Sequence, residues 1–141
     1  MITVALPLPY NGSYQTQWDY ILSSFPPDEL IILGNVNDAP STNVFSKMGA
    51  TYADSLNGQK GTLVVLSPSH GQYVKGDESL VDFEHPDDAI YYFGDDRSAL
   101  GLERIGRPPD HKVFIPTASK DDLFSWQAYA MVAWDRVMKS G

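Results

Sequence analysis

Few side chains in this sequence have the type and spacing needed for acid–base, nucleophilic or metal chemistry. The three histidines, His70, His85 and His111, stand far apart in polar segments, which favours solvated side chains over a shared metal site. The acidic run Glu84–Asp88 could supply metal ligands, but it directly precedes an apolar run, and a turn with solvated carboxylates explains it better. Ser69 is adjacent to His70, which is poor geometry for a nucleophile and its base, and no Gly-x-Ser-x-Gly elbow is present. We therefore expect no metal centre and no hydrolase triad.

Missing motifs and residue types exclude further classes of site. No Gly-x-Gly-x-x-Gly follows the first apolar run, so a dinucleotide site of the Rossmann type is not expected. No Gly-x-x-x-x-Gly-Lys-Ser/Thr sequence indicates a P-loop. The chain has no cysteine, which excludes disulfides, zinc–thiolate sites, iron–sulfur clusters and thiol nucleophiles.

The charge of the chain narrows the choice of partner. The sequence has 10 Lys and Arg against 18 Asp and Glu, which gives a net charge of −8. A protein that binds nucleic acid on its own normally presents a basic stripe. Here the basic residues form only a loose set, Arg97, Arg104, Arg107 and Lys112. The balance favours a small molecule or a protein as partner, and it leaves open an RNA that is held by a local patch on a dimer.

Length and composition indicate one globular domain that covers residues 1–141. A chain of 141 residues falls within the size of a single domain. Its hydrophobic content of 43% and charged content of 20% exclude an intrinsically disordered chain. The apolar runs are far shorter than the ~20 residues that a membrane-spanning helix needs, and no basic residue precedes the first of them. We expect a cytoplasmic protein with no membrane partner.

Five short apolar runs predict β-strands. They are rich in branched side chains, and most of them are followed closely by Gly or Pro, a pattern that is typical of strands buried on both faces. Residues 71–88, by contrast, are largely polar and predicted to be irregular. The five predicted strands are Ile2–Leu8, Leu30–Leu33, Thr62–Leu66, Ala89–Phe93 and Val113–Ile115.

Helical spacing of apolar residues marks three segments between or after these strands. Tyr14–Ser24 carries its apolar residues on one side. Ser41 or Thr42 could cap a short second helix that Gly49 terminates. The last helix follows Ser119–Asp122, which resembles a capping box. Because two faces of this last helix are apolar, we expect it to lie between the sheet and a partner subunit.

The alternation of strands and helices indicates the α/β class, with a parallel sheet flanked by helices. In such sheets, ligands bind at the carboxyl ends of the strands. The polar segments at those ends are Pro9–Ser13, Gly34–Asp38, Ser67–Gly71, Gly94–Leu100 and Pro116–Asp122.

Three segments of the carboxyl-terminal half share their order and spacing with a known family. Asp82–Asp96 is similar to a family strand that ends in Phe-Gly-x-Glu, and Val113–Thr117 is similar to one that ends in Ile-Pro. Asp122–Arg136 looks like the helix that follows, with Asp135 and Arg136 in the place of an acid–arginine pair. Together the three segments resemble the SPOUT (TrmH/SpoU) family of RNA methyltransferases.

This resemblance implies a fold, a cofactor and a reaction. The fold would be SPOUT-like, with a carboxyl-terminal trefoil knot through which the chain from Val113 onward passes. The cofactor would be S-adenosylmethionine (AdoMet), and the reaction would be methylation of a ribose 2′-hydroxyl in tRNA or rRNA. Family members associate through the knot helix, which implies a homodimer that buries Trp126 or Trp134.

The resemblance also assigns the site residues. Asp96 is the acidic candidate for catalysis, and its alternative role is to cap the turn at Arg97 and Ser98. Taken singly, Gly94 and Pro116 could equally do no more than end their strands. The cofactor contacts that the resemblance implies are Leu66, Ser67, Phe93, Gly94, Ile115, Pro116, Thr117, Leu123 and Phe124.

Departures from the family pattern keep a second function open. The first family motif contains an arginine, and the corresponding segment Asn11–Asp19 has none. Asp96 stands in place of a glutamate, and Phe124 stands in place of an asparagine. The alternative is therefore a SPOUT-like binding or structural protein that has lost catalysis. An unrelated flavodoxin-like module ranks lowest, because no phosphate-binding loop follows the first predicted strand.

Overall fold

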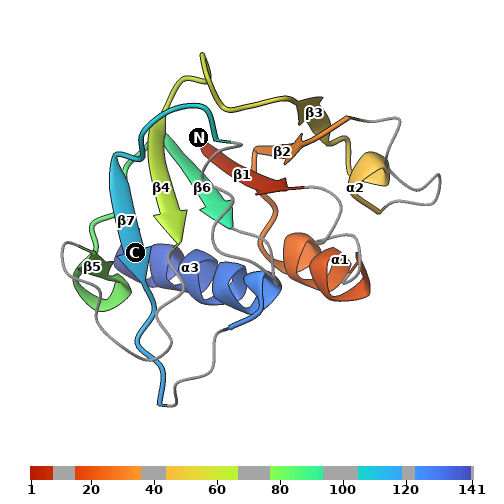
Figure 1. Cartoon of the computed structure of the whole chain (residues 1–141). Helices are drawn as coiled ribbons and strands as arrows, with labels where there is room; N and C mark the ends of the chain where they lie inside the picture. Colours follow the sequence, from red (N-terminus) through yellow and green to blue (C-terminus); the bar gives the residue numbers. More distant parts are fainter. Residues whose placement is uncertain (8–14, 36–43, 67–76, 94–104, 119–122, 141) are drawn as a thin grey trace.

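Seven parallel strands form one sheet in the computed structural model, which describes residues 1–7, 15–35, 44–66, 77–93, 105–118 and 123–140. Their order across the sheet is β3-β2-β1-β6-β4-β7-β5, and each neighbouring pair runs parallel. Figure 1 shows the strands fanning out above helix α3. The strands are β1 (Ile2–Pro7), β2 (Glu29–Leu33), β3 (Thr51–Ala53), β4 (Thr62–Leu66), β5 (Glu78–Ser79), β6 (Ala89–Phe93) and β7 (His111–Phe114).

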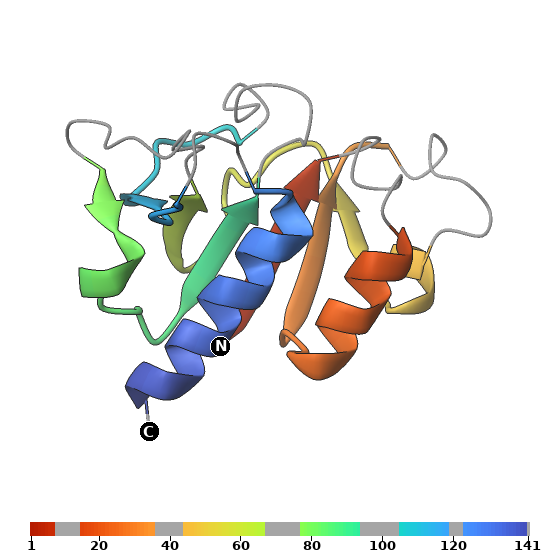
Figure 2. The same cartoon turned by 90° about the horizontal axis from the view of Figure 1, so that it is seen from below.

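Helices cover one face of the sheet. They are α1 (Gln15–Ser24), α2 (Val44–Lys47) and α3 (Ser125–Ser140), and Figure 2 shows α1 and α3 side by side on this face. Alternate strand residues, such as Val4 and Leu6 of β1, point into the core beneath these helices. The parallel sheet flanked by helices is confirmed.

Aromatic rings fill the centre of this core. The ring of Trp18 in α1 stacks on Tyr129 of α3, with 5.9 Å between centroids. The Tyr129 ring also meets Phe93 of β6 edge to face at 5.5 Å. Two helices and the central strand therefore converge on one aromatic cluster, which fixes α3 over the carboxyl half of β6.

Irregular chain covers the other face of the sheet in the part that the structure describes. Leu56 and Ile105 pack there against Ala5, Leu63 and Tyr92. The Leu56 amide donates to the Ile105 carbonyl at 2.7 Å, which joins the two covering segments. Both faces are buried, as the continuously apolar strands predict, but the described part of the second cover is not helical.

The predicted elements agree with the structure where the apolar runs are continuous. Thr62–Leu66 and Ala89–Phe93 have the predicted bounds, and the other three predicted strands differ by one or two residues at their ends. The prediction of irregular structure across residues 71–88 is wrong for β5 and for the 3-10 turn Leu80–Asp82. A two-residue edge strand has too little sequence to show a period, so its pairing with β7 leaves no local signal.

The start of α3 also differs from the prediction. A cap at Ser119 would start the helix before Leu123, whereas α3 begins at Ser125. Phe124 occupies the cap position, and its carbonyl accepts the first helical hydrogen bond from Ala128 at 3.0 Å. Since a Phe side chain has no acceptor, the cap is completed from within the helix. The Gln127 Oε1 accepts from the Phe124 amide at 2.8 Å.

Two further predictions concern the trefoil knot and membrane-spanning helices. The trefoil knot depends on the path of residues 94–104 and 119–122, which lie outside the described residues, so it stays a prediction. Among the described residues, no helix has the length and apolar character to cross a bilayer.

Replacing Gln127 tests this cap. Gln127→Ala removes the acceptor for the Phe124 amide and should lower the free energy of unfolding by about 0.5–1.5 kcal/mol, the usual net worth of one hydrogen bond. Gln127→Glu keeps an acceptor at the same position and should retain the stability. Urea unfolding at one protein concentration compares the three proteins. Equal loss in both variants would contradict the capping role.

Candidate functional site

The carboxyl ends of three adjacent strands form an apolar edge. Leu66 ends β4 and lies level with Phe93 at the end of β6, and β7 pairs with the other side of β4. Ile115 directly follows β7. All three side chains are buried in the helix-covered core, and Leu123 packs against the same cluster. The structure thus brings together four of the nine predicted cofactor contacts.

Of the five remaining predicted contacts, three lie among the described residues and two lie outside them. Pro116 is exposed and Thr117 is half-buried, directly after Ile115. Phe124 is 41% exposed beside the same edge. Ser67, Gly94 and the catalytic candidate Asp96 lie outside the described residues.

Phe124 and Trp126 form an aromatic pair at the start of α3. Their rings are parallel within 9°, with centroids 6.1 Å apart. The Trp126 ring packs against the core, and its buried indole N–H has no hydrogen-bond partner in the described part of the chain. A buried donor without a partner is costly.

A buried polar network lies at the opposite end of α3. The His85 Nδ1 is 2.7 Å from the Tyr91 hydroxyl, and its Nε2 is 2.7 Å from the Asp135 Oδ2. Arg136 donates to the Tyr91 hydroxyl at 2.9 Å and to the Pro86 carbonyl at 2.7 Å. These contacts join α3 to β6 and to the turn that precedes it.

Sequence reasoning missed this network. His85 was expected to be solvated, and this expectation is wrong, because its side chain is only 5% exposed. A signal was present in the helix: Arg136 lies on the same side of α3 as the buried residues Tyr129 and Val132, which are seven and four positions earlier. A charged residue on a buried helix face requires polar partners.

The hydrogen bonds define the protonation states. With Asp135 as a carboxylate, the Nε2–H of a neutral His85 donates to it, and Nδ1 accepts from the Tyr91 hydroxyl. Burial lowers the pKa of His85, and the hydrogen bond to Asp135 only partly opposes this effect. Burial also raises the pKa of Tyr91, so its hydroxyl stays protonated.

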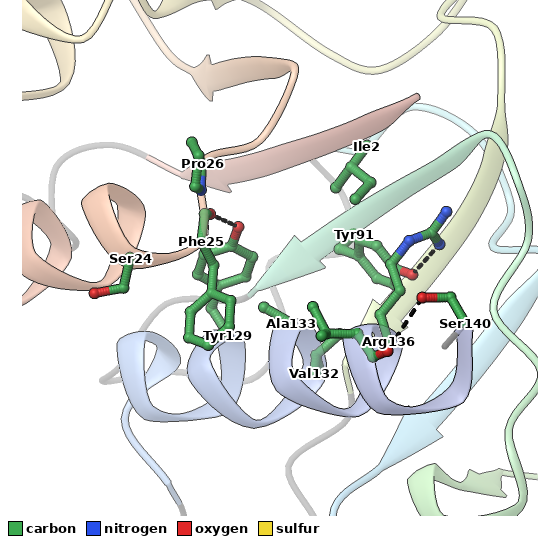
Figure 3. A pocket seen from close by; sticks show the side chains of 11 residues that line it. Ile2, Ser24, Phe25, Pro26, Tyr91, Tyr129, Val132, Ala133, Arg136 and Ser140 are labelled. Atoms are coloured by element: carbon green, nitrogen blue, oxygen red, sulfur yellow. Dashed lines mark hydrogen bonds between the residues drawn. The ribbon is translucent and has the colours of Figure 1, made fainter.

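An apolar groove runs between α1 and α3 beside this network. It has a volume of about 300 Å³, and the residues in Figure 3 line it. The Tyr129 hydroxyl donates to the Phe25 carbonyl at one end, and Tyr91 and Arg136 form the polar wall at the other (Figure 3). None of the predicted cofactor contacts that the structure describes lines this groove.

The outer face of α3 continues the groove with exposed apolar side chains. Met131, Trp134, Val137 and Met138 are all exposed, and Trp134 is 57% exposed. Val137 belongs both to this face and to the groove lining. We call these four residues the α3 stripe.

Comparison with known proteins gives matches in structure alone. No known family profile matches the sequence, and no curated protein matches it. One matching solved structure concerns the 2′-OH methylation of C/U34 on tRNA. It matches with a TM-score of 0.74 and 15% identity, over 100% of this chain and 92% of that chain.

Two further solved structures match over almost the whole chain. The SpoU methyltransferase AviRb from Streptomyces viridochromogenes, in complex with AdoMet, has a TM-score of 0.73 and 18% identity, over 98% of this chain and 57% of that one. A putative RNA methyltransferase from Bacillus anthracis has a TM-score of 0.70 and 17% identity, over 99% and 94% of the two chains.

The lengths of the matched proteins differ. This chain spans just over half of AviRb and 56% of an AdoMet-bound rRNA methyltransferase from Sinorhizobium meliloti, which matches at 13% identity. Sequence identities of 13% to 18% show that this chain and the matched proteins share an architecture. The chain shares the parallel sheet and flanking helices of these methyltransferase structures, as the resemblance of the three sequence segments predicted.

Proposed function

We propose that this protein is an AdoMet-dependent methyltransferase that acts on the ribose 2′-hydroxyl of an RNA, in tRNA or rRNA. The observation that carries the proposal is a fold that matches RNA methyltransferases over nearly the whole chain, two of them with AdoMet bound. The ordered set of Phe93-Gly94, Ile115-Pro116 and Leu123-Phe124 supports the same conclusion from the sequence. A cytoplasmic location accords with such a substrate.

The cofactor site we propose lies at the apolar edge formed by β4, β6 and β7. Leu66, Phe93 and Ile115 are buried, so they would form the floor of this site, and the main chain at these strand ends would bind the adenine edge. Ser67, Gly94, Pro116, Thr117, Leu123 and Phe124 complete the proposed set. AdoMet supplies the electrophilic methyl group when it is bound there.

The reaction needs a group that removes a proton from a weak acid. The ribose 2′-oxygen forms a bond to the methyl carbon while the bond from that carbon to sulfur breaks, and S-adenosylhomocysteine leaves. The hydroxyl proton passes to a base. We assign this role to Asp96, the second of the two acidic residues of the Phe-Gly-Asp-Asp segment and the one at the place of the family glutamate.

Specific observations favour a second candidate, a binding or structural protein without catalysis. The segment Asn11–Asp19 has no arginine, and Phe124 occupies a polar position of the family pattern. The net charge of −8 also disfavours RNA on a single chain. Transfer of a methyl group to RNA separates the two candidates.

We also propose a homodimer that buries the α3 stripe. Exposed apolar surface of this kind marks an interface. The groove beside the stripe offers a complementary hollow, so one surface can serve both subunits of a two-fold pair. A standard interface buries about 1,600 Å² in total.

Enlarging Gly94 tests the cofactor site. A branched side chain at this strand end would occupy space that the ligand needs, so Gly94→Val should abolish AdoMet binding and Gly94→Ala should weaken it less. Calorimetric titration measures the affinity, and thermal unfolding confirms that both variants fold. Equal affinity in Gly94→Val and the wild type would remove the site from this edge.

Neutralising Asp96 tests the base. Asp96→Asn should bind AdoMet as the wild type does and transfer methyl groups about 100-fold or more slowly, the usual contribution of a general base. The matched control is Asp82→Asn, at an exposed carboxylate of the 3-10 turn. Transfer of labelled methyl groups to RNA gives the rates. An unimpaired Asp96→Asn would leave the fold and cofactor site standing but remove this catalytic role.

Truncating Trp134 tests the interface. Trp134→Ala should raise the dimer dissociation constant by about 30-fold or more, because a central tryptophan of an interface is worth about 2 kcal/mol. Val81→Ala is the control, since Val81 is also exposed and apolar but lies on the 3-10 turn. Sedimentation velocity over a range of concentrations measures both. A wild type that stays monomeric at all concentrations would exclude the dimer.

A further inference from the structure

Two residues belong both to the polar network and to the groove wall. Tyr91 and Arg136 line the groove, and both are tied to His85 or its neighbours by hydrogen bonds. His85 itself lies behind them and is buried. A change of charge on His85 would therefore reach the groove through direct contacts.

The charged groups around His85 disfavour a further positive charge on its ring. From α3, Asp135, Arg136 and Lys139 face it, with Lys139 2.9 Å from the Asp135 Oδ2. Lys139 also donates to the Phe83 carbonyl at 2.9 Å. Protonation of His85 would set three cations against the single carboxylate of this group.

Among the residues that the structure describes, the other elements packed against His85 add no anion at contact distance. The Tyr91 hydroxyl of β6 is neutral, and the Phe83 ring meets the His85 ring edge to face at 5.1 Å. His111 of β7 lies on the Phe83 ring and pairs with Glu78 of β5 at 2.6 Å, so this carboxylate is already engaged.

Protonation also conflicts with the hydrogen bonds of Tyr91. A His85 cation carries a proton on Nδ1 and would donate to the Tyr91 hydroxyl, to which Arg136 already donates. The hydroxyl proton would lose its acceptor, a cost in a buried site. Displacement of Arg136 relieves the crowding of positive charges, and the groove is the space that Arg136 borders.

We propose that protonation of His85 weakens the association of two copies of this chain at the groove, with Arg136 and Tyr91 transmitting the change. A second copy is the occupant that fits. The groove continues into the α3 stripe through Val137, and the proposed homodimer buries this stripe, so a second copy would cover both. A displaced guanidinium at the groove wall would have to lose water on docking, which disfavours the dimer.

The direction of the pH effect follows from the pKa. Because the pKa of His85 is lowered in the folded chain, its neutral form is favoured over the whole range above the ordinary value of 6.5. Below that value the unfolded chain binds more protons than the folded one, so stability is lost as pH falls. Because docking disfavours the displaced Arg136, the dimer would lower this pKa further than the monomer does, so the dimer is favoured at neutral pH and loses favour in acid.

The test measures self-association at two pH values. In sedimentation velocity, the wild-type dissociation constant should rise about tenfold or more between about pH 7.5 and about pH 5.5, the change for one unit of pKa difference. His85→Gln keeps hydrogen-bonding capacity without a titrating group and should lose this dependence. The matched control His111→Gln should retain it.

A second measurement needs no variant. By reciprocity, the pKa of the His85 ring, followed by NMR, should fall as protein concentration rises through the dissociation constant. A pKa independent of concentration, a pH dependence that persists in His85→Gln, or a monomer at both pH values would overturn the proposal.

The inference rests on the proposed dimer and not on methyl transfer, and calorimetry with AdoMet separates the two. Absence of AdoMet binding with a pH-dependent dimer would remove the enzyme and support the switch. AdoMet binding with a pH-independent dimer would support the enzyme and overturn the switch.

Discussion

The attachment of α3 to strand β6 is the constraint on which the other features depend. At the carboxyl half of the strand, Tyr129 packs between Trp18 and Phe93. At the middle of the strand and in the turn before it, Arg136 donates to the Tyr91 hydroxyl and the Pro86 carbonyl. Because the helix is held at both ends, its first turn stays beside the apolar edge and its last turns stay beside the groove. One helix thereby connects the proposed cofactor site to the proposed subunit interface.

The core and the sheet could be read from the sequence because they depend on local patterns. Runs such as Thr62–Leu66 and Ala89–Phe93 are apolar throughout, and only a strand covered on both faces has that pattern. β5 could not be read, because its two residues gain their structure from pairing with β7. The cap of α3 is an intermediate case: Gln127 at the third helical position is a signal, but the stronger pattern at Ser119–Asp122 pointed elsewhere.

The two candidate sites also differ in how far the sequence could predict them. The edge formed by Leu66, Phe93 and Ile115 follows from a general rule about parallel sheets, so sequence alone locates it. The His85 network could not be located, since Asp135 is 50 residues away and its approach depends on the packing of α3. Interactions of that range exist only in the assembled fold.

The departures from the family pattern bear on the central claim, which a chemical experiment can test. The claim is that the methyl group goes to a ribose oxygen, although the segment Asn11–Asp19 has no arginine to activate it. Incubation with methyl-labelled AdoMet and bulk RNA, followed by alkaline hydrolysis, measures this directly, because a 2′-O-methyl group protects the neighbouring phosphodiester from alkali. The account predicts label in alkali-resistant dinucleotides. Label confined to mononucleotides that carry it on the base, or no transfer to RNA at all, would contradict it.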